Sequence, residues 1–245
     1  MKDNFSNQAA LYAQYRPSYP AELFDFIFTN IQNRQYAWDC ATGNGQTAIE
    51  LAKVFEKVYA TDISQKQLDH SAASPHIIYS LQPAEKTNFP DNTFDLVTVS
   101  QALHWFKFDE FYPEVKRVSK NGSWIAVWMY ALLNISPQID QLLSHHHFEV
   151  LKDYWDAERK YVDENYKTIP FPFEEITCPD FSIEYTWTLK EFEGYLNTWS
   201  ALQKFVQKNN YNPIKDLVEQ IKPHWISEKR MVRFPLHLRM GKITK

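Results

Sequence analysis

Residues 38–46 read Trp38-Asp39-Cys40-Ala41-Thr42-Gly43-Asn44-Gly45-Gln46 and form a glycine turn between a predicted strand at 36–40 and a predicted helix at 47–55. The chain has only five glycines, and two of them lie in this turn. A strand that runs into closely spaced glycines and then into a helix lets the backbone approach a ligand closely. The turn therefore indicates a nucleotide or nucleoside site, although an ordinary tight turn between a strand and a helix has the same pattern.

Asp62 strengthens the ligand-binding interpretation of the turn. It follows a predicted strand at 57–61, within roughly 20 residues of the glycines, where a carboxylate can accept hydrogen bonds from a ribose. Residues 43–48 also match the dinucleotide pattern G-x-G-x-x-A, so an NAD(P)-dependent oxidoreductase is the rival. Asp39 separates the two ligands, because a carboxylate at the mouth of the first strand suits the cationic end of an amino acid and would repel a pyrophosphate.

The pattern of apolar residues around the turn predicts an α/β fold. Helix-like and strand-like segments alternate through the first half, which calls for a mostly parallel sheet with helices on both faces. The second half is predicted to be mostly helical, with two later strands. The segments, by residue number, are helices at 21–31, 47–55, 64–73, 108–118, 137–167, 189–208 and 214–225, strands at 36–40, 57–61, 94–100, 123–129, 181–189 and 231–244, and a turn at 121–122.

Composition excludes several classes of protein. The 245 residues carry a formal net charge of −4, which argues against general affinity for nucleic acid. Cys40 and Cys178 are the only cysteines and lie far apart, so neither a disulfide framework nor a thiolate zinc site is expected. The N-terminus lacks the pattern of a signal peptide and no apolar run is long enough to cross a membrane. We therefore expect a cytoplasmic protein.

Several further stretches carry a family resemblance. They are residues 12–20 (YAQYRPSYP), the glycine turn, Asp62, residues 83–85 (PAE), residues 94–106 (FDLVTVSQALHWF), residues 115–130 (VKRVSKNGSWIAVWMY) and residues 198–200 (TWS). With them the sequence resembles the class I S-adenosylmethionine-dependent methyltransferases, and more closely the small-molecule subgroup that contains trans-aconitate methyltransferase. The one departure is that Cys40-Ala41-Thr42 stands where glycines are common. The resemblance implies a Rossmann-like fold with a seven-stranded sheet and a helical cap over the acceptor site.

The resemblance also implies how the cofactor would be bound. Asp39 and the backbone of Ala41 and Gly43 would hold its methionine part, with Gly45 completing the turn. Asp62 would hold the ribose. The adenine and the transferable methyl group would be bordered by Ile63, Ala84, Glu85, Ser100 and Gln101. Tyr15 and Arg16 would belong to an N-terminal lid that closes over the cofactor.

A second group of residues is expected at the methyl acceptor. It consists of Arg16, Gln101, His104, Trp105 and Trp199. His104 is the best-placed catalytic base if the acceptor is a hydroxyl or an amine. It could equally orient the acceptor or be a packed structural histidine. Arg16, beside a proline-fixed segment with three tyrosines, is a plausible anion clamp or a surface residue in a salt bridge.

The run His145-His146-His147 suggests a metal, but adjacent helical residues point in different directions. We therefore expect a solvated run and no metal ion. Trp187 and Trp225, like Trp199, are candidates for the floor of the acceptor pocket, with core packing as the alternative.

Together these observations predict one domain, residues 1–245. It would comprise a lid (1–20), a cofactor-binding core (21–130), an acceptor-site cap (131–225) and a closing strand (226–245). The expected reaction is methyl transfer from S-adenosylmethionine to a small molecule. A small carboxylic acid, giving a methyl ester, is the leading acceptor, on the resemblance alone. The alternatives are the oxidoreductase and a non-catalytic, cofactor-binding relative of the fold.

Overall fold

The strand that enters the glycine turn lies at the centre of the sheet. In the computed structural model, which describes residues 17–245, β1 (Tyr36–Cys40) pairs in parallel with β2 (Lys57–Asp62) and with β4 (Phe94–Ser100). β3 (Ile77–Leu81) and β5 (Ser119–Tyr130) extend the sheet in parallel on the two sides. The order β3-β2-β1-β4-β5 reverses direction between β1 and β4. In such sheets ligands bind at this reversal, outside the carboxyl ends of the strands.

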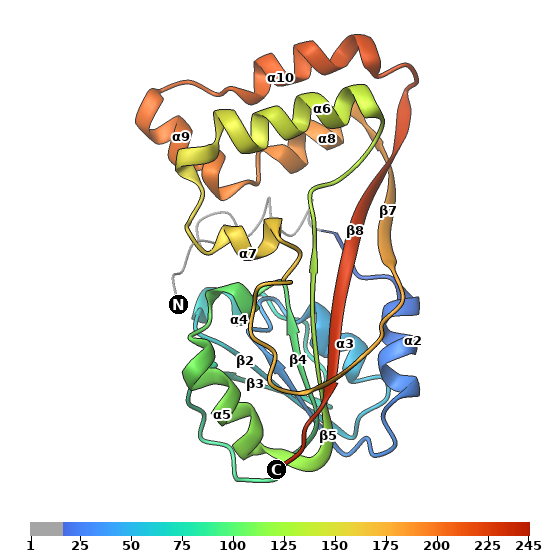
Figure 1. The fold of residues 1–245 in the computed structure, drawn as a ribbon, viewed down its shortest axis with the longest axis vertical. Coiled ribbons are helices and arrows are strands. Elements are labelled where there is room, and N and C mark those ends of the chain that lie inside the picture. The colour runs from blue at the N-terminus through green and yellow to red at the C-terminus, as the bar shows by residue number, and fades with distance from the viewer. Residues whose placement is uncertain (1–16) are drawn as a thin grey trace.

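Three antiparallel strands complete the sheet. The long β8 (Lys229–Lys242) pairs with β5, and β6 (Glu174–Ile176) pairs with the last residues of β8. The path β3-β2-β1-β4-β5-β8-β6 confirms the predicted mostly parallel sheet of seven strands. β7 (Phe181–Thr188) lies off this path and pairs with the first half of β8. As Figure 1 shows, β7 and β8 rise from the sheet to a layer of helices above it.

Helices cover both faces of the parallel strands, as predicted. On one face α2 (Ala21–Thr29) and α3 (Gln46–Leu51) contribute buried apolar side chains to a cluster that includes Ala37 of β1. On the other face α5 (Phe108–Val118) packs on a second cluster that includes Trp38. Neighbouring residues of β1 thus face opposite sides, which is the alternation expected of a strand.

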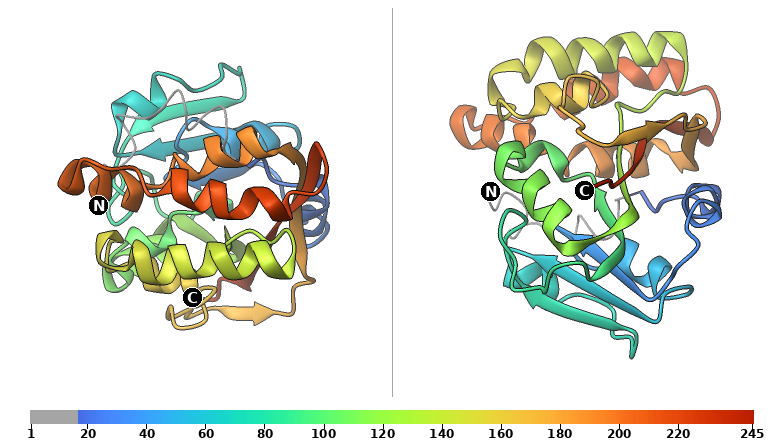
Figure 2. Two further views of the ribbon diagram at one scale, coloured as in Figure 1. Left: turned by 90° about the horizontal axis from the view of Figure 1, so that it is seen from above. Right: turned by 60° about the horizontal axis from the view of Figure 1, so that its bottom comes forward.

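Above the carboxyl ends of the strands lies a helical cap, which consists of α6 (Pro137–His145), α8 (Leu189–Leu196), α9 (Ser200–Asn209) and α10 (Ile214–Ile221). Figure 2 shows α6 and α10 side by side across the top of the molecule. α7 (Arg159–Asp163) lies between the cap and the sheet (Figure 1). Apolar residues of the cap belong to the same buried cluster as α2 and α3.

Several predicted segments differ in length from those in the structure. The helix predicted at 64–73 is the four-residue α4 (Gln65–Leu68), and α3 ends earlier than predicted. The helix predicted at 189–208 breaks at residues 197–199 into α8 and α9. The turn predicted at 121–122 lies inside β5, where Gly122 has φ +79° and the register against β4 shifts. Short helical turns make up the rest, namely η1 (Leu103–Trp105), η2 (His146–Val150), η3 (Lys152–Tyr154) and η4 (Lys222–His224).

Candidate active site

Backbone conformation makes the turn after β1 open to a ligand. Ala41, Gly43 and Gly45 have φ values of +55°, +58° and +85°, a left-handed region that glycine adopts readily. Gly45 stands at the N-cap of α3, and a Cβ there would lie 2.4 Å from the hydroxyl of Tyr79. Thr42 N–H donates to the carbonyl of Thr61 in β2 (2.9 Å), which fixes the turn to the neighbouring strand.

Asp39 stabilises the turn through hydrogen bonds from buried side chains. The carboxylate is fully buried, and its oxygens accept hydrogen bonds from the hydroxyls of Thr42 (2.5 Å) and Thr98 (2.8 Å). Loss of hydration raises its pKa to about 6, because these hydrogen bonds offset burial only in part. Both carboxylate oxygens are therefore bound by the protein's own hydroxyls, which favours an indirect role in cofactor binding. The direct contact with the methionine part stays a prediction.

Asp62 faces the turn from the end of β2. Its carboxylate accepts hydrogen bonds from the backbone N–H groups of Gly43 and Ser64, both at 2.9 Å, and the residue is 8% exposed. Ile63 beside it is half-buried. A carboxylate has about four acceptor positions, so this one can accept further hydrogen bonds from ligand hydroxyls.

The other predicted cofactor residues lie in the segment after β3 and at the end of β4. Ala84 is buried, and Glu85 accepts a hydrogen bond from the backbone N–H of Lys107 (3.2 Å) just before α5. Ser100 accepts a weak hydrogen bond from Thr47 of α3 (3.2 Å).

Gln101 continues the line of β4 and is held by β5. It has φ +54°, and its side-chain oxygen accepts a hydrogen bond from the backbone N–H of Tyr130 (2.8 Å). Two features fit S-adenosylmethionine: the turn at Gly43 and Gly45, where a ligand can approach the backbone, and a carboxylate at the end of β2. Tyr15 and Arg16, also predicted here, lie outside the described residues.

A cavity lies between the end of β4 and the cap, and its volume is about 730 Å³ including space open to solvent. Four of the predicted acceptor residues, Gln101, His104, Trp105 and Trp199, line it together. Residues that were not predicted to contact the acceptor complete the lining: Tyr130, Trp155, Asp156, Arg159, Val162, Tyr195, Thr198 and Ser200. The fifth predicted residue, Arg16, lies outside the described part of the chain.

Arg159 brings a positive charge to this cavity. Its Nε donates to Asp163 (3.0 Å), and its guanidinium lies over the ring of Trp155, 4.6 Å from the centroid. Within residues 17–245 its terminal nitrogens Nη1 and Nη2 make no hydrogen bond. Asp156, the acidic residue of the lining, is paired with Lys204 (2.6 Å). Nothing in the local sequence distinguishes Arg159 from a surface arginine of an amphipathic helix.

His104 lines the cavity and is buried, at 6% exposure. Its Nδ1 lies 2.7 Å from the hydroxyl of Tyr166, which is 1% exposed and comes from the loop after α7. Its ring packs against Trp105 with centroids 4.8 Å apart. The sequence analysis did not identify Tyr166, because 62 residues separate it from His104.

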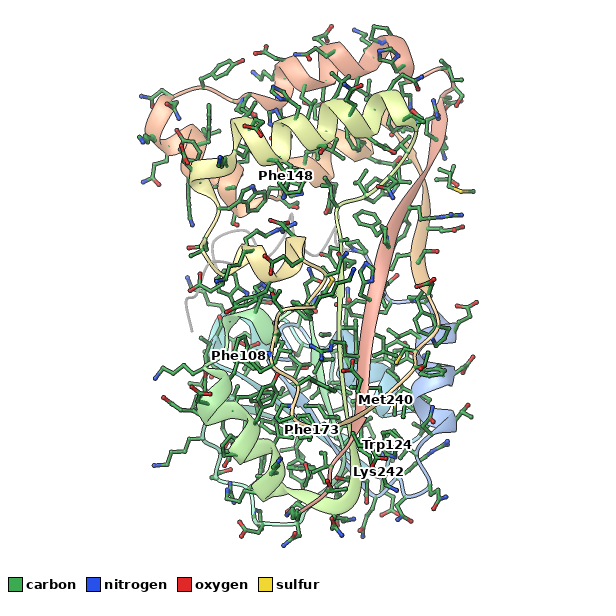
Figure 3. All side chains as sticks on the ribbon, viewed as in Figure 1. Phe108, Trp124, Phe148, Phe173, Met240 and Lys242 are labelled. Carbon is green, nitrogen blue, oxygen red and sulfur yellow. The ribbon has the colours of Figure 1, made fainter. Side chains whose placement is uncertain are left out.

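The expectation that His145–His147 form a solvated run is wrong. His145 is exposed, but His146 and His147 are 5% and 0% exposed. Both lie in the π-helical η2. Phe148, the residue after them in η2, is 43% exposed (Figure 3). His147 packs between Trp155 and Trp199, and its Nε2 lies 3.3 Å from Asp163. The tight packing of the cap, which local polarity does not reveal, accounts for the burial.

The remaining candidates, Trp187 and Trp225, are not among the residues that line the cavity. Trp187 stacks on Tyr185, and Trp225 packs on Phe192. Across the described range 17–245, no three potential metal ligands of the His, Cys, Asp or Glu type come together. No helix among those residues is long and apolar enough to cross a membrane.

Comparison with known proteins gives one consistent result. A methyltransferase domain family matches residues 38–127. A Dictyostelium discoideum protein named as a methyltransferase is 34% identical over 224 residues, which cover 90% of this chain and 84% of that protein. An uncharacterized methyltransferase of Mycobacterium tuberculosis is 33% identical over 130 residues, which cover 52% of this chain and 53% of that protein. A solved structure from Anaeromyxobacter dehalogenans, titled as a type II methyltransferase, has a TM-score of 0.86 at 33% identity, covering 94% of this chain and 99% of its own.

Proposed function

The chain belongs to the class I S-adenosylmethionine-dependent methyltransferases, and from this premise we propose that its acceptor is a small carboxylic acid, which it converts to a methyl ester. The observation that carries the proposal is Arg159, whose guanidinium reaches the acceptor cavity with two terminal nitrogens free of hydrogen bonds to residues 17–245. A guanidinium presents paired donors that match a carboxylate.

The cofactor residues keep their predicted roles in this proposal. When bound, S-adenosylmethionine supplies an electrophilic methyl group on a sulfonium. Asp62 accepts hydrogen bonds from the ribose while it holds the turn through Gly43. Ile63, Ala84 and Glu85 border the adenine, and Ser100 and Gln101 lie toward the methionine end.

Gln101 connects the two halves of the site. It follows directly on β4, at the reversal of the sheet, and it also lines the acceptor cavity. Its amide is held by the backbone of Tyr130, so its position is set by the sheet rather than by the ligand. An acceptor in the cavity is therefore aligned against the cofactor end of the sheet, and alignment is the main contribution a protein makes to this reaction.

A carboxylate suits the remaining lining of the cavity. A carboxylate oxygen is already nucleophilic and needs no base, but it must be held by a cation or by hydrogen-bond donors. Arg159 provides the cation, while His104 provides a donor. The rings of Trp105, Trp155 and Trp199 exclude water and accommodate the carbon skeleton. Arg16, which lies outside the described residues, is the second predicted anion contact.

The test is to identify the product. Purified protein is incubated with S-adenosylmethionine and a panel of small mono-, di- and tricarboxylic acids. The resemblance to the subgroup of trans-aconitate methyltransferase makes the unsaturated tricarboxylic acids the first to try. The expected product gains one methyl group by mass spectrometry and releases methanol in mild alkali, as an ester does. Amides and alcohols of the same skeletons should stay unmethylated. Methylation of an alcohol or an amine, with every acid inert, would overturn the proposal.

A further inference from the structure

The contact between His104 and Tyr166 joins two buried polar groups, of which His104 lines the acceptor cavity. His104 lies in η1, just after β4, and Tyr166 lies in the loop that follows α7. The phenol oxygen is 2.7 Å from Nδ1 of the imidazole, and the two rings are tilted with centroids 5.8 Å apart. The distance fits a strong hydrogen bond, so one of the two groups donates to the other.

The surroundings of Tyr166 decide which group donates. Burial raises the pKa of this phenol well above its ordinary value, so the hydroxyl keeps its proton. Among residues 17–245, Nδ1 of His104 is the only acceptor within hydrogen-bond distance of the hydroxyl. If Nδ1 carried the proton and donated, the phenol hydrogen would be buried without an acceptor, which native structures avoid. The phenol O–H therefore donates to Nδ1.

The fold holds Tyr166 at this position. Asn165 and Tyr166 both have left-handed φ values, +55° and +59°, which are unusual for residues with side chains. Arg239 of β8 fixes the loop, because its Nη1 donates to the carbonyls of Tyr166 (3.0 Å) and Ile169 (2.8 Å). The same guanidinium is paired with Glu175 (2.8 Å). A strained backbone that the surrounding structure maintains is typical of functional sites.

We propose that Tyr166 is a positioning residue that locks His104 in the Nε2–H tautomer, so that the imidazole serves the acceptor as a hydrogen-bond donor and not as a base. A neutral imidazole has one N–H donor and one acceptor nitrogen. Once Nδ1 accepts from Tyr166, the proton resides on Nε2. His104 lines the acceptor cavity, where Nε2–H binds one carboxylate oxygen while Arg159 neutralises the charge. This inference rests on the proposed function for the acceptor class, although the tautomer itself does not.

The decisive measurement is nitrogen-15 NMR of the imidazole side chains in the whole protein. The long-range proton–nitrogen correlations distinguish the two neutral tautomers. The spectrum is recorded at about pH 8, above the ordinary histidine pKa of about 6.5. We expect His104, assigned by its loss in His104→Gln, in the Nε2–H form. In Tyr166→Phe we expect a mixture of the two forms. An Nδ1–H tautomer in the wild type would overturn the inference, and so would an unchanged Nε2–H form in Tyr166→Phe.

Kinetics supply an independent test of the donor role. Gln can place an amide N–H near the position of Nε2 but cannot act as a base. We expect His104→Ala to raise the acceptor KM by about tenfold, and His104→Gln to restore most of that loss. A kcat that vanishes equally in both variants would show a base and contradict the inference. Tyr112→Phe is the matched control for Tyr166→Phe, because its hydroxyl donates to the carbonyl of Pro170 away from the cavity.

The two proposals fail in different ways. If no carboxylic acid is methylated, the acceptor class is wrong, while the NMR result still reports the tautomer. If acids are methylated but His104 carries its proton on Nδ1, the proposed function stands and only the role of Tyr166 falls.

Discussion

The carboxylate of Asp62 lies 2.9 Å from the backbone nitrogen of Gly43, so one hydrogen bond joins the end of β2 to the turn that follows β1. The other carboxylate oxygen accepts from the N–H of Ser64, at the start of α4. Asp62 therefore fixes both strand ends between which the cofactor is expected to bind. A substitution at this position would remove the proposed ribose contact and would also loosen the turn.

Asp62→Asn tests this arrangement. The amide keeps the size of the side chain but loses the charge and one acceptor group, so hydrogen bonds to ribose and to the turn are weakened together. We expect the Kd of S-adenosylhomocysteine, measured by calorimetric titration, to rise about 10- to 100-fold. Asp69→Asn is the control, because Asp69 is exposed at the C-terminal end of α4 and its side chain accepts a hydrogen bond from Gln65. Wild-type affinity in Asp62→Asn would rule out the proposed ribose contact.

Gly45→Ala should destabilise the protein more than an alanine in a comparable glycine position. The new Cβ would have to adopt φ +85° and would lie 2.4 Å from the hydroxyl of Tyr79. Gly122 is the matched control, because its φ is +79° but the nearest atom to a Cβ there is 3.8 Å away. In urea unfolding we expect Gly122→Ala to lower the free energy of unfolding by about 1–2 kcal/mol, because alanine is strained in the left-handed backbone conformation.

Gly45→Ala should lower the free energy of unfolding by more than Gly122→Ala does, because the contact of the new Cβ with Tyr79 adds an overpacking cost of about 1–3 kcal/mol. Adding Tyr79→Phe, which removes the hydroxyl, should recover part of the difference and leave the backbone strain. Equal losses at the two glycines would mean that Tyr79 moves away without cost.

The sequence predicted four of the five parallel strands, β1, β2, β4 and β5, because their signals are local, but it did not predict β3. β1 and β4 begin and end at the residues predicted for them, and β4 is rich in β-branched residues. The glycine turn and Asp62 were also predicted, because a strand, closely spaced glycines and a following carboxylate lie close together in the chain. The shortening of α3 and α4 is a local error at helix ends, where tertiary contacts outweigh propensity.

The residues that the sequence did not reveal depend on contacts between distant segments. Tyr166 reaches His104 across 62 positions, and Arg159 lines the acceptor cavity because α7 is placed between the cap and the sheet. The burial of His147 depends on the rings of Trp155 and Trp199. The pattern of polar and apolar residues along the chain does not predict such packing, so these groups can be identified only in the folded structure.

Burial of His146 predicts that the cap loses stability in acid. Its Nε2 has no partner among the described residues, and loss of hydration lowers its pKa from 6.5 to about 4. The unfolded chain binds a proton at the ordinary pKa of about 6.5, whereas the folded one does so only near 4. Stability from this group is therefore fully present above about pH 6.5 and is lost as the pH falls toward 4.

The measurement compares urea unfolding at about pH 8 and about pH 5. From about pH 8 to about pH 5, protonation of His146 in the unfolded chain should lower the free energy of unfolding of the wild type by about 2 kcal/mol. His147, whose pKa is also lowered by burial, acts in the same direction, whereas Asp39, whose pKa is raised, opposes it. The comparison with His146→Leu isolates the effect, since that variant should lose about 2 kcal/mol less. The exposed His145→Gln should behave like the wild type. An unchanged pH dependence in His146→Leu would contradict the prediction.

Arg159→Gln tests the anion contact in the acceptor cavity. Removing the guanidinium leaves a carboxylate without its cation, so the acceptor KM should rise about 10- to 100-fold. Arg159→Lys keeps the charge but loses the paired donors, so its acceptor KM should lie between the KM of Arg159→Gln and that of the wild type. The Kd of S-adenosylhomocysteine should stay unchanged, because Arg159 is assigned to the acceptor side of the site. Arg233→Gln is the control, since Arg233 is exposed and pairs with Glu184 between β7 and β8. If Arg159→Gln methylates the same acid with wild-type KM, the carboxylate is held elsewhere and Arg159 only braces α7 through Asp163.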